Sequence, residues 1–561
     1  MKKITIWSAA AAMLLLTSCG GGLGQLTADN FRVVPTPLEA ESGQVQATIN
    51  GLFPEKYMNK KAVITVTPEL RFQKDGMIHT VKGQPATFQG EKVLGNDQTI
   101  SYLLGGHYTM KTAFPYQEAM QKSDLYMNFK AFVGNKEVEV PAVKVANGVL
   151  ATSELYHRTL TTAKPCEAQD AFQRVTEQKL DANVKFLIQQ AELRQSELKS
   201  NSVQDFVKLL QEIAKDQENK MISNVEISAY ASPDGGVQLN EKLANKRQQN
   251  TEEYVKQQMK QAKLDANVSS EYTAQDWEGF QQLVQASNIQ DKDVILRVLS
   301  MYQDPQEREQ QIKNMSMGFR ELADGILPEL RRARMTINYE TVGRDDEQIF
   351  NQFSSDPSQL SLEELIYAAS ISKDQSLKEQ ILTYAIEKFP QDYRAYNNLA
   401  VNAIQKGKND EARRWLKQAS SVNANGAETN ANYGLLALME GDTKTAEEYI
   451  SKAAGAKGLA ETIGNLHLAQ GNYALAQQDF GYTRSNSAAL AQILNKDYAK
   501  AAQTLSGIKN PDGMTDYLNA IVNARQGNND IAASFLRSAI QKDPSLAQYA
   551  ANDLEMVMVK R

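Results

Sequence analysis

Histidine and cysteine are scarce in this chain of 561 residues, which holds 4 His and 2 Cys. Zinc and iron sites are built largely from clusters of these side chains, so we expect no metal site and no cofactor. Positive charge is not in excess either, since Lys+Arg is 61 against Asp+Glu 67 and the formal net charge is -6. A mildly acidic chain releases few counterions by covering phosphates, so nucleic acid is not an expected partner.

Catalytic motifs are also missing. The sequence has no Gly-x-Ser-x-Gly motif, no phosphate-binding Gly-rich loop and no His-Glu-x-x-His pattern. Carboxylates are abundant, but solvated helices expose many of them, and spacing alone does not identify the pair that a cell-wall hydrolase needs. The sequence therefore predicts a protein that is not an enzyme.

The one long apolar run lies at the start of the chain. Lys2 and Lys3 precede the apolar residues 4–16, and Leu16-Thr17-Ser18-Cys19 follows. The run is too short for a stable membrane span. It resembles a bacterial lipoprotein signal peptide with its lipobox. The resemblance implies that residues 1–18 are removed and that Cys19 is acylated and anchored in lipid.

The residues after Cys19 bear on location. Residues 19–30 start with a glycine-rich stretch, which predicts a flexible tether. In such lipoproteins an Asp after the cysteine favours the inner membrane and an acidic patch favours surface export. Neither is present here, which favours an outer-membrane lipoprotein that faces the periplasm.

Residues 31–165 favour an antiparallel β-sandwich. Short β-rich runs such as 62–66 and 125–132 are punctuated by Gly and Pro at near-regular spacing. The histidines of this part are far apart in sequence, and no catalytic constellation is visible.

Residues 170–342 predict an α+β domain. We expect strands at 184–188 and 225–232, an amphipathic helix at 202–213 and a further helix at 238–260. Apolar–polar alternation at 334–337 predicts the closing strand. Residues of about 273–330 have a helical pattern and predict an insertion.

Several residues of this domain stand in the register of a known family. They are Ala229, Tyr230, Gly235, Asn240, Leu243 and Arg247. On them the segment is similar to the OmpA C-terminal domain family, which binds the diaminopimelate of peptidoglycan. The resemblance implies that Arg247 holds a carboxylate, because an Arg fork can bind one bidentately.

One position departs from the family. Its Asp, which meets the ammonium of the ligand, falls on Ser232, and Asp234 two residues later is the available substitute. The peptidoglycan-binding candidates are therefore Ser232, Asp234, Asn240 and Arg247. The alternative is a domain kept as a structural or protein-binding module.

A repeat fills the rest of the chain after a polar linker at 343–358. Within residues 359–561, Gly407, Ala412, Leu416 and Ala419 recur as Gly441, Ala446, Ile450 and Ala453, each 34 positions later. The pattern resembles tetratricopeptide repeats (TPR), which implies an all-α solenoid with a concave groove. By family position Arg394, Asn397 and Gln405 face the groove, where a protein segment would bind.

The predicted fold is thus a β-sandwich, an OmpA-like α+β domain with a helical insertion, and a TPR solenoid. The function it favours is that of an envelope adaptor, anchored through Cys19, that binds protein partners and, in one version, peptidoglycan. The alternative is an accessory subunit of a secretion or surface-filament assembly that does not bind peptidoglycan.

Overall fold

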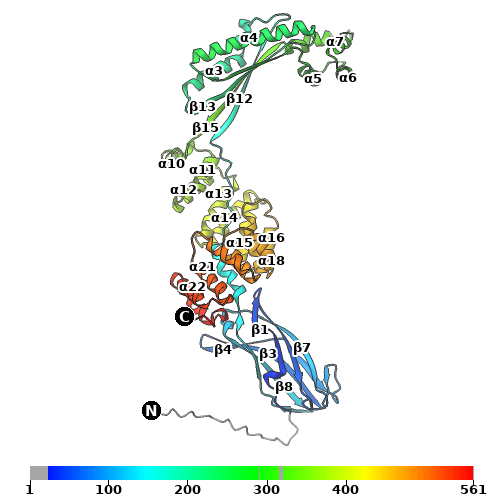
Figure 1. Ribbon diagram of the computed structural model, residues 1–561, viewed down its shortest axis with the longest axis vertical. Helices are drawn as coiled ribbons and strands as arrows, with labels where there is room; N and C mark the ends of the chain where they lie inside the picture. The colour runs from blue at the N-terminus through cyan, green and yellow to red at the C-terminus, as the bar shows by residue number, and fades with distance from the viewer. Residues whose placement is uncertain (1–22, 290, 315–319, 560–561) are drawn as a thin grey trace. The chain divides into compact units, whose positions relative to one another are not determined.

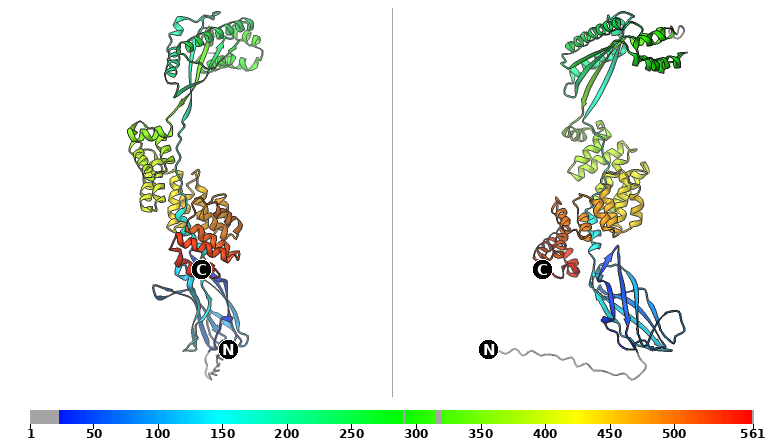
Figure 2. Two further views of the ribbon diagram at one scale, coloured as in Figure 1. Left: turned by 60° about the vertical axis from the view of Figure 1, so that its left-hand side comes forward. Right: turned by 45° about the vertical axis from the view of Figure 1, so that its right-hand side comes forward.

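The computed structural model describes residues 23–289, 291–314 and 320–559 and forms two compact units (Figure 1 and Figure 2). Unit 1 includes the chain up to Gln169 and resumes at Ser372, whereas unit 2 is Asp170–Ile371. In sequence, unit 2 is therefore an insertion into unit 1. The expected signal peptide, 1–18, and Cys19 lie outside the described residues.

Two β-sheets that share one core form the first part of unit 1. Val45 and Ile49 of one sheet are buried in the same core as Ile64 and Leu125 of the other, which confirms the predicted sandwich. The sheet orders are β11-β1-β2-β7 and β10-β8-β3-β5-β6, with β4 paired to β3 and β9 to β8. The strands are β1 (Phe31–Glu41), β2 (Gln44–Phe53), β3 (Ala62–Lys74), β4 (Met77–Lys82), β5 (Ala86–Gly90), β6 (Gln98–Ile100), β7 (Gly106–Pro115), β8 (Ser123–Val133), β9 (Lys136–Val138), β10 (Val143–Asn147) and β11 (Val149–Leu150).

The sandwich differs from the prediction in two respects. Two pairs, β1 with β11 and β5 with β6, are parallel, because the short strands β6 and β11 join the edges of their sheets through loops rather than hairpins. The strands also end at Leu150, although the sequence predicted a sandwich that continues to residue 165. Residues 151–169 leave the sandwich and run among the helices of the repeat.

Helix pairs form the rest of unit 1. Ala412, Leu416 and Ala419 are fully buried on one face of α14, as the predicted repeat register requires. The turn glycine Gly407 has φ +71, a left-handed conformation that glycine adopts at no steric cost. The helices are α12 (Gln375–Lys388), α13 (Tyr393–Gln405), α14 (Asn409–Val422), α15 (Ala427–Met439), α16 (Thr443–Ile450), α17 (Leu459–Ala469), α18 (Tyr473–Phe480), α19 (Asn486–Leu494), α20 (Tyr498–Ser506), α21 (Gly513–Arg525), α22 (Asn529–Lys542) and α23 (Leu546–Asn552).

Unit 2 has a four-stranded sheet of order β12-β15-β13-β14 with α3 and α4 packed on it. The bounds are β12 (Val175–Lys185), α2 (Gln195–Leu198), α3 (Asn201–Lys215), β13 (Lys220–Tyr230), α4 (Val237–Ala262), β14 (Val268–Thr273) and β15 (Arg332–Val342). The strand predicted at 184–188 is displaced, because β12 begins at Val175 and ends at Lys185, and residues 186–188 belong to the loop beyond it.

Two further groups of helices in unit 2 follow β14 and β15. The inserted α5 (Trp277–Ala286), α6 (Lys292–Met301), α7 (Pro305–Asn314) and α9 (Leu327–Leu330) share a small core of their own. The segment predicted as a linker, 343–358, contains α10 (Asp346–Ser355), which begins where Asp345 accepts a hydrogen bond from the Gln348 backbone N–H. Ile349 is the buried residue of α10. The next helix, α11 (Leu362–Ile371), is the last element of unit 2.

Candidate functional site

A segment of the chain itself covers the first helices of the helix pairs, the face on which the sequence analysis expected a partner groove. Residues 151–169 pass along the first helices of the pairs, α13, α15, α17, α19 and α21, and Figure 2 shows this cyan segment between the yellow and orange helices. Leu155, Tyr156 and Leu160 are buried in one core with these helices. The groove that the sequence assigns to a partner is therefore occupied in unit 1.

Asparagine side chains hold the backbone of this segment. Asn432 of α15 accepts a hydrogen bond from the Cys166 N–H at 2.7 Å and donates to the Cys166 carbonyl at 2.8 Å. Asn398 of α13 does the same to Ala168, at 2.8 and 2.9 Å. An amide side chain offers both a donor and an acceptor, so it pairs with a peptide group as a neighbouring β-strand would. Recognition of this kind depends little on the side chains of the bound segment.

Asn397 completes the contact from α13. Its amide donates to the Cys166 carbonyl at 3.1 Å and its oxygen accepts from Asn432 at 3.0 Å. Asn397 and Asn432 are both fully buried. The Cys166 thiol is buried beside them, and this burial raises its pKa to about 11. Burial also raises the pKa of the nearby Glu461 carboxyl, an effect that Lys164 opposes.

The start of the segment is held by the C-terminal end of the chain. Tyr549 donates to the Ala151 carbonyl at 3.2 Å, and Thr152 donates to Glu555 at 2.5 Å. Arg525 of α21 forms an ion pair with Glu555 at 2.5 Å. The segment is therefore held at its start as well as at Cys166 and Ala168.

The three groove candidates occupy different environments. Asn397 binds the chain's own backbone, as described above. Arg394 forms an ion pair with Asp392 at 3.0 Å and donates to the Gln169 carbonyl at 3.3 Å. Gln405 is exposed at the end of α13. The sequence analysis missed Asn398, Asn432 and the segment 151–169, although Asn398 and Asn432 are 34 positions apart and so follow the repeat period.

The peptidoglycan candidates of unit 2 surround the turn between β13 and α4. Asn240 donates to the carbonyls of Ser232 and Gly235, each at 2.8 Å, and so closes the turn. Ser232 donates to Asp234. Asp234 forms an ion pair with Arg331 at 3.1 Å, a residue that the sequence analysis did not single out.

Arg247 lies in the same region but is not open to a ligand. Its side chain is buried, with 1% of the residue exposed, and its guanidinium donates to the carbonyls of Gln190 at 3.0 Å, Tyr230 at 2.9 Å and Leu187 at 3.3 Å. It also lies over the Phe186 ring at 5.0 Å. Burial and the neighbouring Arg331 lower the pKa of Arg247 to about 10, so it stays charged at neutral pH. Its donors hold the loop after β12 against β13.

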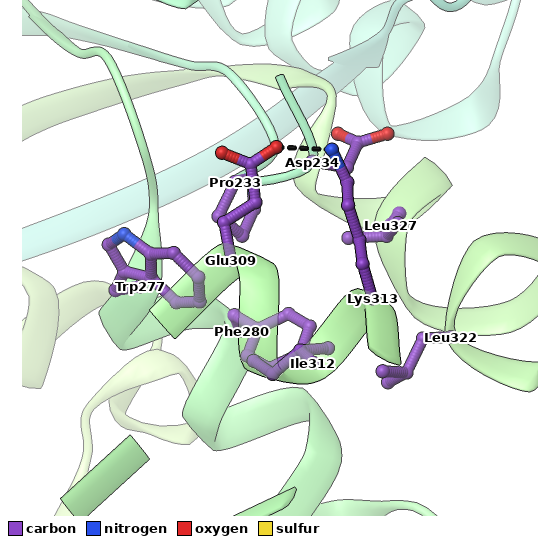
Figure 3. Close-up of a pocket in the computed structure, with 9 residues that line it drawn as sticks. All are labelled: Pro233, Asp234, Trp277, Phe280, Glu309, Ile312, Lys313, Leu322 and Leu327. Atoms are coloured by element: carbon purple, nitrogen blue, oxygen red, sulfur yellow. Dashed lines mark hydrogen bonds and ion pairs between the residues drawn. The ribbon is translucent and has the colours of Figure 1, made fainter. Parts of the chain in front are cut away.

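The inserted helices cover the turn from the other side. Pro233 and Asp234 face Trp277, Phe280, Ile312, Leu322 and Leu327, with Glu309 and Lys313 ion-paired at the rim (Figure 3). The cavity that remains between them is about 10 Å³. A space of that size holds at most one water molecule, so the described side chains of the insertion leave no room for a peptide between them.

A larger recess lies on the repeat itself, between α14, α15 and α16. It has a volume of about 440 Å³ and is lined by Arg413, Arg414, Lys417, Tyr433, Ala437, Glu440, Asp442, Thr445 and Tyr449. The rings of Tyr433 and Tyr449 stack at 4.8 Å, and Arg413 forms an ion pair with Glu440. Arg414 and Lys417 are exposed. The recess thus offers a stacked aromatic wall beside basic side chains.

Two further searches concern the described residues only. Within residues 23–289, 291–314 and 320–559, no group of three His, Cys, Asp or Glu side chains is placed to hold a metal ion. None of the helices in this part of the chain combines the length and apolarity needed to cross a membrane.

Comparisons with known proteins give similarity to helical-repeat structures. No family model matches the chain, and no curated protein matches it. A tetratricopeptide repeat protein from Parabacteroides merdae ATCC 43184 is 15% identical, with a TM-score of 0.29, over 37% of this chain and 91% of that one. The APC/C hetero-tetramer Cut9–Hcn1 is 12% identical, with a TM-score of 0.31, over 49% of this chain and 58% of that one.

Proposed function

We propose that this protein is a non-enzymatic adaptor of the cell envelope, anchored to the periplasmic side of the outer membrane by lipid on Cys19. It binds protein partners through the outer surface of its repeat. The lipobox supports the anchor, and the absence of catalytic motifs in the sequence supports a binding role.

The occupied groove is the observation that carries this proposal. Helical repeats commonly bind segments in their groove, but here Asn397, Asn398 and Asn432 already bind residues of the same chain. We therefore propose the recess between α14, α15 and α16 as the partner surface. Its stacked tyrosines supply the rigid aromatic contact area that dominates binding energy at interfaces, and Arg414 and Lys417 favour an acidic partner segment.

A photo-crosslinking amino acid at Arg414 in intact cells tests this surface. We expect it to capture a defined protein, and the double variant Tyr433→Ala, Lys417→Glu to lose that protein from affinity purification. Arg537, exposed on α22, is the control position for both the crosslinker and a charge reversal. Equal capture from Arg537 and Arg414 would contradict the proposed surface.

Peptidoglycan binding is the second function that the resemblance implies, and the geometry of unit 2 weighs against it. The Arg247 guanidinium already donates to three backbone carbonyls, and Asp234 forms an ion pair with Arg331. A diaminopimelate ligand would have to displace these contacts. These contacts favour an adaptor that binds protein partners without binding the wall, and an accessory subunit of a secretion or surface-filament assembly stays the alternative.

Sedimentation with purified sacculi separates the two versions. The assembly subunit stays in the supernatant. A wall-binding adaptor sediments, and Asp234→Asn releases it whereas the exposed control Asp265→Asn does not. Arg247→Ala is a poor probe, because it removes the donor to three backbone carbonyls that hold the loop after β12 and so acts on stability as well.

The anchor is tested separately in cells. Cys19→Ala should move the protein from the membrane fraction to the soluble periplasm and abolish incorporation of an alkyne-bearing palmitate. Retention of Cys19→Ala in membranes after a high-salt wash would count against lipid anchoring.

A further inference from the structure

Three leucines protrude from loops at one end of the sandwich. Leu94 is 103% exposed, Leu103 61% and Leu104 79%. Leu94 lies between β5 and β6, and the other two lie in the turn between β6 and β7. Large apolar side chains that gather at one place on a surface mark a contact with a partner or a membrane.

Hydrogen bonds join these loops into one tip. The Lys56 N–H donates to the Tyr102 carbonyl at 2.6 Å, and the Lys92 N–H donates to the Lys60 carbonyl at 2.7 Å. Ser101 donates to Glu91 at 3.1 Å, which ties the loop of Leu94 to the turn of Leu103 and Leu104. We call residues 54–61, 90–97 and 101–105 the leucine tip.

The described chain begins at the leucine tip. Gly24 lies against the ring of Tyr57, and Leu26 is buried in the sandwich core. Cys19 precedes Gly24 by five positions, and an extended chain of that length spans at most about 18 Å. An acylated Cys19 would therefore keep the leucine tip within reach of the bilayer surface.

We infer that Leu94, Leu103 and Leu104 insert into the bilayer surface and so fix how the sandwich stands on the membrane. This rests on the proposed lipid anchor. Separate side chains on short turns suit shallow insertion between lipid headgroups, whereas a protein interface of standard size needs a broad packed face. The leucine tip also carries exposed Lys56, Lys61 and Lys92, which can meet lipid phosphates, alongside exposed Glu55, Glu91 and Asp97.

A reconstitution that does not depend on cellular lipidation tests the insertion. The chain from Cys19 onward is coupled through the Cys19 thiol to maleimide lipid in vesicles of phosphatidylethanolamine and phosphatidylglycerol; Cys166, 1% exposed, is shielded from coupling. Leu104→Trp is compared with Ile78→Trp, which replaces an equally exposed side chain on β4. β4 follows the far end of β3, a strand of 13 residues or roughly 40 Å.

The readout is quenching of the introduced tryptophan's fluorescence by lipids that carry bromine on their acyl chains. We expect the indole introduced at Leu104 to be quenched and the indole at Ile78 to be unaffected, with the parent protein as the baseline. An unquenched indole at Leu104 on coupled protein overturns the inference, even where palmitate labelling has established the anchor. Labelling of Cys19 and insertion of the tip are thus judged by separate measurements.

A second arm uses free protein with Cys19→Ser. Without the anchor the parent protein should bind these vesicles only weakly, so sedimentation is measured at high lipid concentration, and the lipid-binding constant should fall at least tenfold in the triple variant Leu94→Ser, Leu103→Ser, Leu104→Ser. The double variant Met77→Ser, Ile78→Ser should sediment as the parent does. If the triple variant instead abolishes a dimer in sedimentation velocity and leaves vesicle binding unchanged, the tip binds a second copy and the inference is wrong.

Discussion

Replacing Asn432 by alanine should open the occupied groove without unfolding the repeat. The change removes the acceptor of the Cys166 N–H and one donor to the Cys166 carbonyl, which keeps its bond from Asn397. A buried polar group left without its partner costs about 1–3 kcal/mol. The N–H loses its partner outright and the carbonyl in part, so the closed groove should be destabilised by about 2–4 kcal/mol.

The thiol of Cys166 reports this opening directly. In protein with Cys19→Ala, Cys166 is the remaining cysteine, and it is buried in the closed groove. Its modification by a thiol reagent therefore requires local release of the segment. Since 1.4 kcal/mol corresponds to a factor of ten, Asn432→Ala should speed labelling by roughly 30- to 700-fold.

Asn402→Ala is the matched control. Asn402 is buried on the same helix as Asn397, but its amide donates to Glu379 rather than to the segment. Its labelling rate should stay near that of the parent. If Asn432→Ala and Asn402→Ala label at the same rate, the asparagine contacts do not hold the segment. If labelling rises only together with loss of the far-UV signal, release is global and the reasoning fails as well.

Three further changes test other parts of unit 1. Ala412→Leu should overpack α14 and lower the unfolding free energy by about 1–3 kcal/mol in chemical denaturation; no change would contradict the repeat register. Lys496 has φ +64 at the turn where other repeats have glycine, a left-handed conformation that costs energy for a residue with a Cβ atom. Lys496→Gly should therefore raise the unfolding free energy by up to about 1 kcal/mol, which a higher thermal midpoint would show. Burial raises the pKa of Asp553 to about 6, above its value near 4 in the unfolded chain. The native state thus holds a proton that the unfolded state has lost, and the contribution of Asp553 to stability falls as pH rises from 4 to 6, by about 2–3 kcal/mol. Asp553→Asn should remove this slope from melts recorded at pH 4.5 and 7; the same slope in both proteins would exclude Asp553 as its source.

Local patterns in the sequence predict most of the elements. Alternation at 62–66 marks β3, and the spacing of Ala412, Leu416 and Ala419 marks the buried face of α14. These patterns arise because one face of each element is buried, so they are visible without knowledge of the partner element. The helix predicted at 202–213 spans Asn201–Lys215 in the structure, so the pattern located the helix but gave its ends only approximately.

Long-range contacts could not be predicted in the same way. Nothing in residues 151–169 indicates that they bind a groove, because Asn398 and Asn432 contact their backbone rather than their side chains. Arg247 was assigned to a ligand on the basis of its position on α4. Its actual partners are the carbonyls of Leu187, Gln190 and Tyr230, and main-chain groups carry no signal in the sequence. The pairing of Asp234 with Arg331, 97 positions apart, was missed for the same kind of reason.

The distance along the chain between the segment and its groove dictates an order of assembly. Cys166 and Asn432 are separated by 266 positions, and Ala151 and Tyr549 by 398. A chain that emerges from its amino end can complete the sandwich while the apolar residues Leu155 and Tyr156 still lack the helices that bury them. Loss of the last helix, even in a mature molecule, would remove Tyr549 and so release the start of the same stretch at Ala151. Proteolytic quality control could therefore recognise truncated copies by an interior segment far from the cut.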